Sequence, residues 1–500
     1  MRILHISTRL ILGGSQENTV LSCEGQARLG HEVHLAFGPI FGPEGSLLER
    51  VEAFNQNQGG GLSNVCQQGG GLSNLCRQGG GLSSPRRPPN QHAPEANPQP
   101  HSGLESPLPC DDDAFLCDDD APPCDDARPC GDTHPPTIPI GIHTIPNLCR
   151  ELSPGKDIRA YRELKHLIAT LKPDIVHTHS SKAGVLGRAA AWSVRAHGLE
   201  SRATSHGSES RATGGLCPAI IHTIHGPPFM PIEGSPLRRT LIRTKNHIYT
   251  LAERFAARRC HTIVSVADAM TEQFLERNIG APAQYITIRS GMETEPFLTP
   301  RPGEHRSEIR RELGLAETDF VIGTVARLAE HKGHDDILDA LGEDLRAHPH
   351  WKLLWVGDGW WGDRLRARAR DMGLADQLIT TGLVPNDRVP AMMRAMDILV
   401  HPSYREGLPR TVPQALLAGV TPIAYDADGT REICRTSETG ILVPIADRAA
   451  LRAAVVGMYE QPDERRHLAA TGRAECAREF AAERMVHLLE EVYANAIKHA

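Results

Sequence analysis

Cationic and acidic side chains follow two apolar runs in the second half of the chain. Arg327 and Lys332 come at and after the end of the run 320–326, and Glu406 comes after the run 398–400. The carboxyl ends of parallel strands meet at one edge of a sheet, so these side chains can converge on one ligand. Cations held on one loop bind an anion and stabilise charge that grows on phosphate oxygens. The pattern therefore favours an anion-binding site, the alternative for Arg327 or Lys332 alone being a solvated surface cation.

Histidines lie at the ends of two apolar runs in the first half of the chain. His179 ends one run, and His225 closes another just before a glycine. Side chains alternate between the two faces of a strand, and those at its carboxyl end lie nearest a ligand. We therefore expect His179 and His225 to face the ligand. His177 and His222 lie further back along the same runs, so we expect them in the core.

The elements that position these residues begin with a strand, a glycine turn, a helix and a second strand within residues 1–36. Gly13 and Gly14 form the turn, and the helix is expected at 16–29. No G-x-G-x-x-G follows the first strand, so the segment does not indicate a dinucleotide-binding dehydrogenase. A second alternation of strands and helices starts at 320. The fold class predicted is α/β, with two doubly wound units and a ligand in the cleft between them.

Two stretches interrupt this alternation. Residues 55–137 contain a ten-residue Gly-rich repeat followed by a seven-residue Cys-Asp repeat, and about 193–216 contain a short duplication. Such composition buries too little apolar surface to offset chain entropy, so both are expected to be disordered inserts. The alternative for the Cys-Asp repeat is a metal-binding tail. Zinc sites space their paired ligands by two to four residues, whereas this spacing follows the repeat, which favours loop expansion.

Charge and hydropathy exclude several classes of protein. The formal net charge is −7, and residues 110–132 alone carry nine Asp and one Arg, so the rest of the chain is close to neutral. This argues against a nucleic-acid partner, which would require a basic excess. No apolar run is long enough to span a membrane, and no secretory signal is evident at the N-terminus, so the expected compartment is the cytoplasm.

The motifs in their order resemble the family 4 glycosyltransferases, enzymes of the GT-B architecture with two Rossmann-like domains. The resemblance covers nearly the whole chain apart from the two inserts. It implies an N-terminal acceptor-side domain at 1–290, a donor-binding domain at 291–480 and a final helix at 481–500 that crosses back to the first domain. The motifs that carry it are Gly13-Gly14, Val176-His-Thr-His179, His222-Thr-Ile-His225-Gly226, Ser290-Gly291, Arg327 to Lys332-Gly333, His401 to Pro409 and Gly429-Thr-Arg-Glu432.

The resemblance also implies roles for individual residues. Glu406 would contact the sugar of a nucleotide donor, and its alternative is a carboxylate that merely favours a helix N-terminus near Leu408. Gly407 would let the backbone approach the donor. The expected catalytic residues are Glu406, Arg327, Lys332 and His225. The expected donor-binding residues are Gly13, Gly14, Gly407, Leu408, Pro409, Gln414 and Glu432, and the expected acceptor-side residues are His179 and Lys182.

Gln414 stands where the family usually has a second glutamate that holds the ribose hydroxyls. An amide still forms hydrogen bonds there, but without the strength that charge adds. Asp426-Ala-Asp428 matches the metal-binding string of another glycosyltransferase architecture. It lies where this family has a loop without metal, so neither a metal nor another cofactor is expected.

The segment 237–259 combines arginines with an apolar side formed by Leu241, Ile248, Leu251 and Phe255. One interpretation is peripheral contact with an anionic membrane, where a lipid-linked acceptor would lie. The other is a helix packed on its sheet with a solvated basic face.

The function predicted is transfer of a hexose, with retention of configuration, from a nucleotide diphosphate donor, UDP being the expected nucleotide. The acceptor would be a glycan, a lipid-linked glycan or a small molecule, in cell-surface polysaccharide or glycoconjugate synthesis. The alternatives are a nucleotide-sugar epimerase of the same architecture, a non-catalytic sugar-nucleotide-binding protein, and a scaffold organised by the Cys-Asp insert.

Overall fold

The computed structural model describes residues 1–40, 45–58, 137–204, 217–230 and 235–500, with the backbone alone for 197–204. All of these residues belong to one compact unit. The predicted insert at 55–137 lies outside the described residues except at its two ends, where 55–58 are helical.

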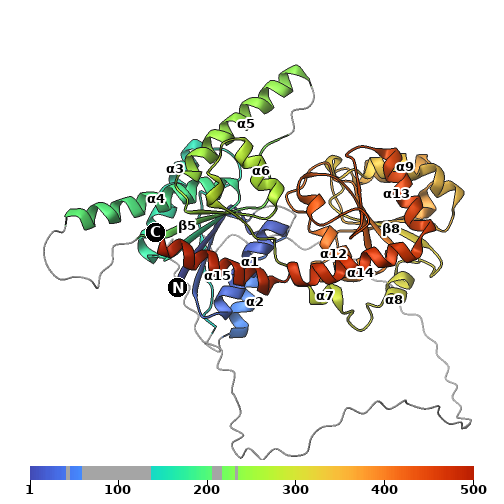
Figure 1. The fold of residues 1–500 in the computed structure, drawn as a ribbon, viewed down its shortest axis with the longest axis horizontal. Coiled ribbons are helices and arrows are strands. Elements are labelled where there is room, and N and C mark those ends of the chain that lie inside the picture. Colours follow the sequence, from blue (N-terminus) through green and yellow to red (C-terminus); the bar gives the residue numbers. More distant parts are fainter. Residues whose placement is uncertain (41–44, 59–136, 205–216, 231–234) are drawn as a thin grey trace, which may run out of the picture. The chain divides into compact units, whose positions relative to one another are not determined.

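Seven parallel strands form the first sheet, in the order β3-β2-β1-β4-β5-β6-β7 (Figure 1). Its central strands are buried along almost their whole length, as a sheet covered on both faces requires. The strands are β1 Arg2–Ser7, β2 Glu32–Phe37, β3 Gly141–Thr144, β4 Ile175–His179, β5 Ala219–Ile224, β6 Thr262–Ser265 and β7 Tyr285–Thr287.

Helices connect these strands and cover the sheet. The α1 helix begins at Gly14, directly after the predicted glycine turn, and the His179 and His225 positions lie at the carboxyl ends of β4 and β5. The helices are α1 Gly14–Arg28, α2 Leu48–Gln58, α3 Pro154–Leu171, α4 Ser181–Thr204, α5 Pro236–Ala257 and α6 Asp268–Glu276.

A second parallel sheet has six strands in the order β10-β9-β8-β11-β12-β13. The strands are β8 Phe320–Val325, β9 Trp351–Val356, β10 Leu378–Gly382, β11 Ile398–His401, β12 Thr421–Tyr425 and β13 Ile441–Val443. The helices of this part are α7 Glu295–Leu298, α8 Arg306–Glu312, α9 His334–Ala347, α10 Gly362–Asp371, α11 Val389–Arg394, α12 Thr411–Leu417, α13 Arg448–Glu460 and α14 Pro462–Glu479. The two parallel sheets with their helices confirm the predicted fold class.

The last helix, α15 Ala482–Lys498, packs on the first sheet although it follows the second in the sequence (Figure 1). Its apolar residues recur at helical spacing, and Met485, Leu489 and Tyr493 join Ile3 of β1 and Ile221 of β5 in one buried cluster. The strongly amphipathic pattern at the end of the chain therefore has its partner in the first part of the chain.

The predicted insert at about 193–216 is wrong in its first half. Residues 193–204 continue α4, so the loop that the duplication suggested starts later than expected. The remainder, 205–216, lies outside the described residues. In the part of the chain that the structure describes, no helix is both long enough and apolar enough to cross a membrane.

Candidate active site

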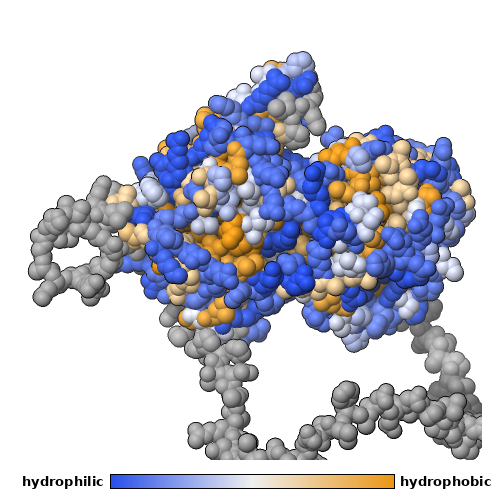
Figure 2. Space-filling view, in the orientation of Figure 1, coloured by the Kyte–Doolittle hydropathy of each residue, from blue (hydrophilic) through white to orange (hydrophobic). Residues whose placement is uncertain are grey.

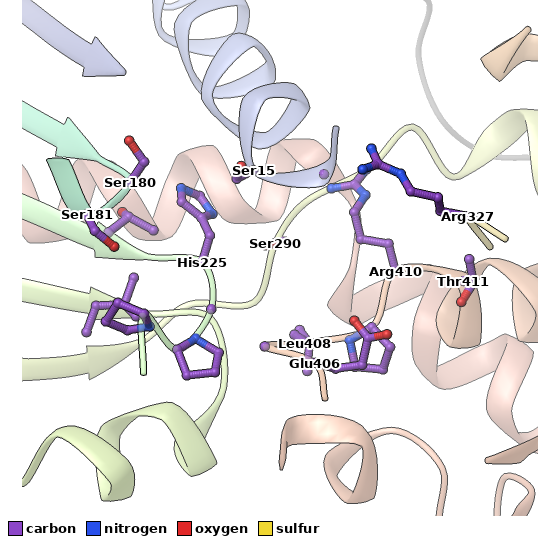
Figure 3. A pocket seen from close by; sticks show the side chains of 18 of the residues that line it. Ser15, Ser180, Ser181, His225, Ser290, Arg327, Glu406, Leu408, Arg410 and Thr411 are labelled. Atoms are coloured by element: carbon purple, nitrogen blue, oxygen red, sulfur yellow. The ribbon is translucent and has the colours of Figure 1, made fainter. Parts of the chain in front are cut away.

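A cavity of about 540 Å³ lies at the carboxyl ends of strands from both sheets (Figure 3). Thr223, His225 and Ser180 line it from the side of the first sheet, and Arg327 and Glu406 from the side of the second. The four residues predicted to be catalytic from the sequence all line this cavity: Glu406, Arg327, Lys332 and His225.

Glu406 is held by two cation-forming groups. Its Oε1 accepts a hydrogen bond from Lys332 Nζ at 2.5 Å and lies 3.1 Å from His401 Nε2. The backbone N–H of Glu406 donates to Asp428 Oδ2 at 2.8 Å. Burial by itself would raise the pKa of Glu406, but Lys332 and His401 hold it well below its usual range. The cavity therefore contains an ionised carboxylate in a fixed position.

A second, larger cavity of about 1030 Å³ adjoins the first. Gly14, Val325, Arg327 and Arg410 border both cavities. Arg410 is anchored by a 3.1 Å hydrogen bond to the Gly291 carbonyl and a 3.0 Å ion pair with Glu17. Two guanidinium groups thus stand where the two cavities meet. Figure 3 shows the side chains of Arg327 and Arg410 near each other at the pocket.

The glycines of the site allow backbone and side chains to approach one another closely. A Cβ atom on Gly407 would lie 2.3 Å from the His225 carbonyl oxygen, and one on Gly14 would lie 2.5 Å from Arg410 Cδ. The space that a Cβ of Gly407 would occupy is filled by the backbone of His225 and Gly226, while Gly407 itself lines the smaller cavity. The glycine is needed to join the two halves of the cavity.

His225 lines the cavity, but His179 does not; it is buried beneath His225. His179 Nδ1 lies 3.1 Å from His225 Nε2, and His179 Nε2 lies 2.9 Å from His5 Nδ1. The expectation that His179 faces an acceptor is therefore wrong, because its ring is buried and is hydrogen-bonded through both nitrogens to other histidines. His222, expected in the core, is buried yet lines the cavity.

Other predicted binding residues are distributed around the two cavities. Gly14, Gly407, Leu408 and Pro409 line the smaller cavity, whereas Gly13 and Gln414 line the larger one.

Besides His179, two predicted site residues line neither cavity. Lys182 pairs with Asp157 at 2.5 Å, and Glu432 pairs with Arg289 at 3.0 Å and accepts from the Ala269 N–H. Both side chains are engaged in structural ion pairs away from the cavity walls.

The helix expected to start near Leu408 begins at Thr411 as α12 and has seven residues. The segment 408–410 is instead an irregular connection. The positive charge at the cavities therefore comes mainly from the side chains of Arg327, Lys332 and Arg410, and less from the N-terminus of a helix.

Two candidate metal-ligand sets do not fit a metal. Nitrogens of His5, His177 and His179 lie within 4.8 Å of one another, but every one of these rings is hydrogen-bonded through both nitrogens. Asp426 pairs with Arg431, and Asp428 accepts hydrogen bonds from Gln273 and from the Glu406 backbone. Asp428 thus helps to orient the loop that carries Glu406.

Comparison with known proteins identifies the family. Residues 305–475 match the model of "Glycosyl transferases group 1", and residues 114–291 match that of "Glycosyl transferase 4-like domain". The chain is a family 4 type glycosyltransferase of the GT-B architecture.

Named relatives of this glycosyltransferase are bacterial. It is 27% identical to the putative glycosyltransferase EpsD of Bacillus subtilis over 340 residues, 68% of this chain and 81% of EpsD. It is 28% identical to the UDP-Gal:alpha-D-GlcNAc-diphosphoundecaprenol alpha-1,3-galactosyltransferase of Escherichia coli over 307 residues, 61% of this chain and 70% of that enzyme. Among solved structures, Anabaena Alr3699/HepE in complex with UDP is 16% identical, with a TM-score of 0.63 over 99% of this chain and 100% of that one, which shows the same fold.

Sequence reasoning about this glycosyltransferase missed two residues that line the smaller cavity, Arg410 and Glu253. Arg410 directly follows the His401 to Pro409 motif, which could have pointed to it. Glu253 lines the smaller cavity from α5, where its buried carboxylate accepts a 2.6 Å hydrogen bond from Arg188. Arg188 and Glu253 lie 65 positions apart in the sequence, and no local pattern links them.

Proposed function

We propose that this glycosyltransferase moves a hexosyl group from a uridine diphosphate sugar to a hydroxyl group of an acceptor, with retention of configuration. The observation that carries the proposal is the pair of adjoining cavities that meet at Arg327 and Arg410. The Escherichia coli relative is named for a UDP-galactose donor, and Alr3699/HepE was solved with UDP, which supports the choice of nucleotide.

The two cavities suit the two ends of such a donor. The larger one has apolar walls that include Trp360, Leu383 and Val384, which suit a nucleoside. The smaller one is lined by Glu406, His225 and Thr223, which can form hydrogen bonds with sugar hydroxyls. The diphosphate would then lie between them, beside the guanidinium groups.

Departure of the nucleotide places growing negative charge on the diphosphate. Arg327, Arg410 and Lys332 border the cavities in positions set by the fold, so they would stabilise that charge without reorganisation. Lys332 has a second task, because its hydrogen bond keeps Glu406 ionised. An ionised Glu406 can accept hydrogen bonds from sugar hydroxyls but cannot donate a proton. These cations supply the positive charge that other transferases draw from a metal, so we propose catalysis without a metal or other cofactor.

The contacts of the carboxylates in the smaller cavity support retention of the anomeric configuration. Of the described residues that line the smaller cavity, Glu253 and Glu406 are the carboxylates. Glu253 is tied to Arg188, and Glu406 to Lys332 and His401. Because neither stands free to act as a nucleophile or base, the departing phosphate itself would accept the acceptor's proton on the same face of the sugar.

The test is a panel of nucleotide sugars incubated with the purified chain and scored by nucleotide release and by the anomeric configuration of the product. Glu406→Gln should reduce donor turnover by about 10²- to 10³-fold, the range measured when a preorganised polar group is removed from a transition state. Glu343→Gln, which changes an exposed carboxylate on α9, is the matched control. Unchanged turnover in Glu406→Gln would remove Glu406 from the site, and an inverted product would refute retention.

The same panel separates the alternative functions. An epimerase would convert the donor into its epimer without an acceptor, and a sugar-nucleotide-binding protein would bind donor without releasing nucleotide. Deletion of 61–133 tests the scaffold hypothesis, because transfer should survive that deletion.

We further propose that α5 contacts an anionic membrane surface and presents a lipid-linked acceptor, in the synthesis of a cell-surface polysaccharide or glycoconjugate. The helix was expected either to pack its apolar side or to expose it, and the structure exposes it: Leu237 is 83% exposed and Leu241 56%. Arginines and lysine of the same turns, such as Arg238 and Lys245, are exposed as well. Figures 1 and 2 show α5 projecting with hydrophilic and hydrophobic residues side by side.

Apolar side chains flanked by cations fit a surface of anionic headgroups over acyl chains. The Escherichia coli relative is named for an acceptor on diphosphoundecaprenol, which supports a lipid-linked acceptor here.

Cosedimentation with vesicles tests this. The chain should bind vesicles of phosphatidylglycerol and phosphatidylcholine mixed, and bind pure phosphatidylcholine vesicles more weakly. Leu237→Ser with Leu241→Ser should abolish binding, whereas Leu152→Ser with Ile158→Ser, which changes two other exposed apolar residues, should not. Equal binding by both double variants would refute the role of α5.

A further inference from the structure

A buried line of hydrogen-bonded side chains runs beneath the smaller cavity and reaches its wall at two points. From Gln26 on α1 one branch passes through His5 on β1 and His179 on β4 to His225. The other passes through Tyr493 on α15 and His177 on β4 to Thr223 on β5. The heavy-atom distances along the two branches lie between 2.6 and 3.1 Å.

The rings in this line are uncharged, so each carries one N–H and one bare nitrogen. Burial lowers the pKa of His5 to about 4 and that of His225 to about 3, and it lowers the pKa of His177 and His179 well below the usual value. In a line of neutral rings each contact needs one donor and one acceptor. The tautomer of one ring therefore fixes the tautomer of every other.

The amide of Gln26 fixes the direction of both branches. Its Oε1 can only accept, so His5 donates from Nε2 and accepts at Nδ1 from His179 Nε2. His179 then accepts at Nδ1 from His225 Nε2, which leaves His225 Nδ1 bare. Among the described residues, His225 Nδ1 is a buried atom without a hydrogen-bond partner.

The second branch runs in the opposite direction. Gln26 Nε2 donates to Tyr493 Oη, so Tyr493 donates to His177 Nδ1, and His177 donates from Nε2 to Thr223 Oγ1. The hydroxyl hydrogen of Thr223 is then left for a ligand. Both His225 and Thr223 line the cavity, so one amide makes the first an acceptor and the second a donor.

We propose that Gln26 sets the hydrogen-bonding polarity of the sugar-binding wall, so that His225 Nδ1 accepts from, and Thr223 Oγ1 donates to, hydroxyl groups held in the cavity. Gln26, His5, His179, His177 and Tyr493 act through those two residues and are positioning residues. The nature of the ligand rests on the proposed function, but the direction of the hydrogen bonds does not.

The charge around His225 keeps its ring neutral. Burial and the nearby guanidinium of Arg410 both disfavour a further proton on His225. The ring therefore carries one N–H and one bare nitrogen, as the two branches require.

The experiment uses the full chain labelled with ¹⁵N-histidine and reads the tautomer from the ring nitrogen shifts in long-range ¹H–¹⁵N spectra. The His225 signals are assigned by their loss in His225→Ala. In the wild-type protein His225 should carry its proton on Nε2. Gln26→Met should give a mixture of tautomers at His225, whereas Gln26→Glu, whose carboxylate still accepts from His5, should keep the Nε2 proton.

Two controls accompany the variants. The His34 and His143 pair, 3.1 Å apart elsewhere on the same sheet, should keep its signals in Gln26→Met. Gln377→Met removes a different buried amide, in the second domain, and should leave the His225 signals unchanged. Gln26→Met should also lower kcat roughly 2- to 10-fold with little change in the donor KM, the loss of about one neutral hydrogen bond in the transition state.

A wild-type His225 that carries its proton on Nδ1, or His225 signals that do not change in folded Gln26→Met, would overturn the proposal. If the wild-type chain transfers no sugar from any donor, the proposed function fails, and the nitrogen shifts still decide the direction of the hydrogen bonds.

Discussion

Replacing Lys332 with methionine removes the cation that holds Glu406 ionised. The two side chains are 19% and 14% exposed, and their atoms are 2.5 Å apart, so little solvent screens the pair. Removing one partner of a buried ion pair leaves an uncompensated charge and costs about 3–5 kcal/mol in the free energy of unfolding. Activity should fall by about 10²- to 10³-fold as well, because a cation is lost from the cavity where the diphosphate would leave.

The pH dependence of the variant gives a sharper signature. In the wild-type protein the pKa of Glu406 is lowered, so its stabilising contribution is present above the unfolded-state pKa of about 4.3 and is lost as the pH falls through the lower folded pKa. In Lys332→Met, burial still raises the pKa of Glu406 and only His401 still lowers it, so this pKa should rise. The folded state then binds the proton more tightly than the unfolded state, so the variant should lose stability as the pH rises.

Urea unfolding between pH 4 and 8, with nucleotide release measured over the same range, tests both points. Glu406→Gln added to Lys332→Met should recover much of the lost stability, since it removes the buried charge, but not the activity. Lys332→Arg keeps the charge and serves as the control. A Lys332→Met protein as stable as the wild type at pH 8 and within threefold of its activity would refute this account of the pair, since a threefold change is only about 0.65 kcal/mol.

Three further outcomes follow from the described contacts. Gly407→Ala should reduce kcat/KM at least tenfold and lower the melting temperature, because its Cβ would lie 2.3 Å from a carbonyl oxygen. A Cβ on Gly457, in the helix α13, would meet nothing within 4 Å, so Gly457→Ala should stabilise the protein by about 0.5–1 kcal/mol. Equal effects of the two substitutions would contradict the steric argument. Arg188→Met should destabilise by about 3–5 kcal/mol by leaving Glu253 buried and unpaired, and Arg188→Met with Glu253→Gln should recover most of that loss in urea unfolding. Dialysis against EDTA should leave nucleotide release unchanged, and a loss that Mn²⁺ or Mg²⁺ restores would show that catalysis needs a metal.

The same residues show why part of the site was predictable from the sequence. Arg327, Lys332, Glu406 and His225 each follow a strand, and in parallel sheets the strand ends coincide, so local pattern was enough to bring them to one cavity. The helix expected at 16–29 and the apolar runs 320–326 and 398–400 are close to α1, β8 and β11, because apolar periodicity reflects local geometry.

Other features depended on contacts between distant segments. His179 lies beneath the cavity instead of on its wall, since its ring is enclosed between His5 on β1 and His225. The space beside Gly407 belongs to the His225 backbone, 182 residues earlier in the numbering, and α5 exposes leucines that its own pattern could equally have buried.

The sequence by itself therefore determined the α/β class, the order of the motifs and the charged residues at the strand ends, because each depends on residues near one another in the chain. Only the tertiary structure decided which histidine faces the cavity, that Arg410 and Glu253 join it, and that Gln26 and Tyr493 meet under its wall. Those arrangements depend on contacts between segments far apart in the sequence, such as the packing of α15 on α1 and β5.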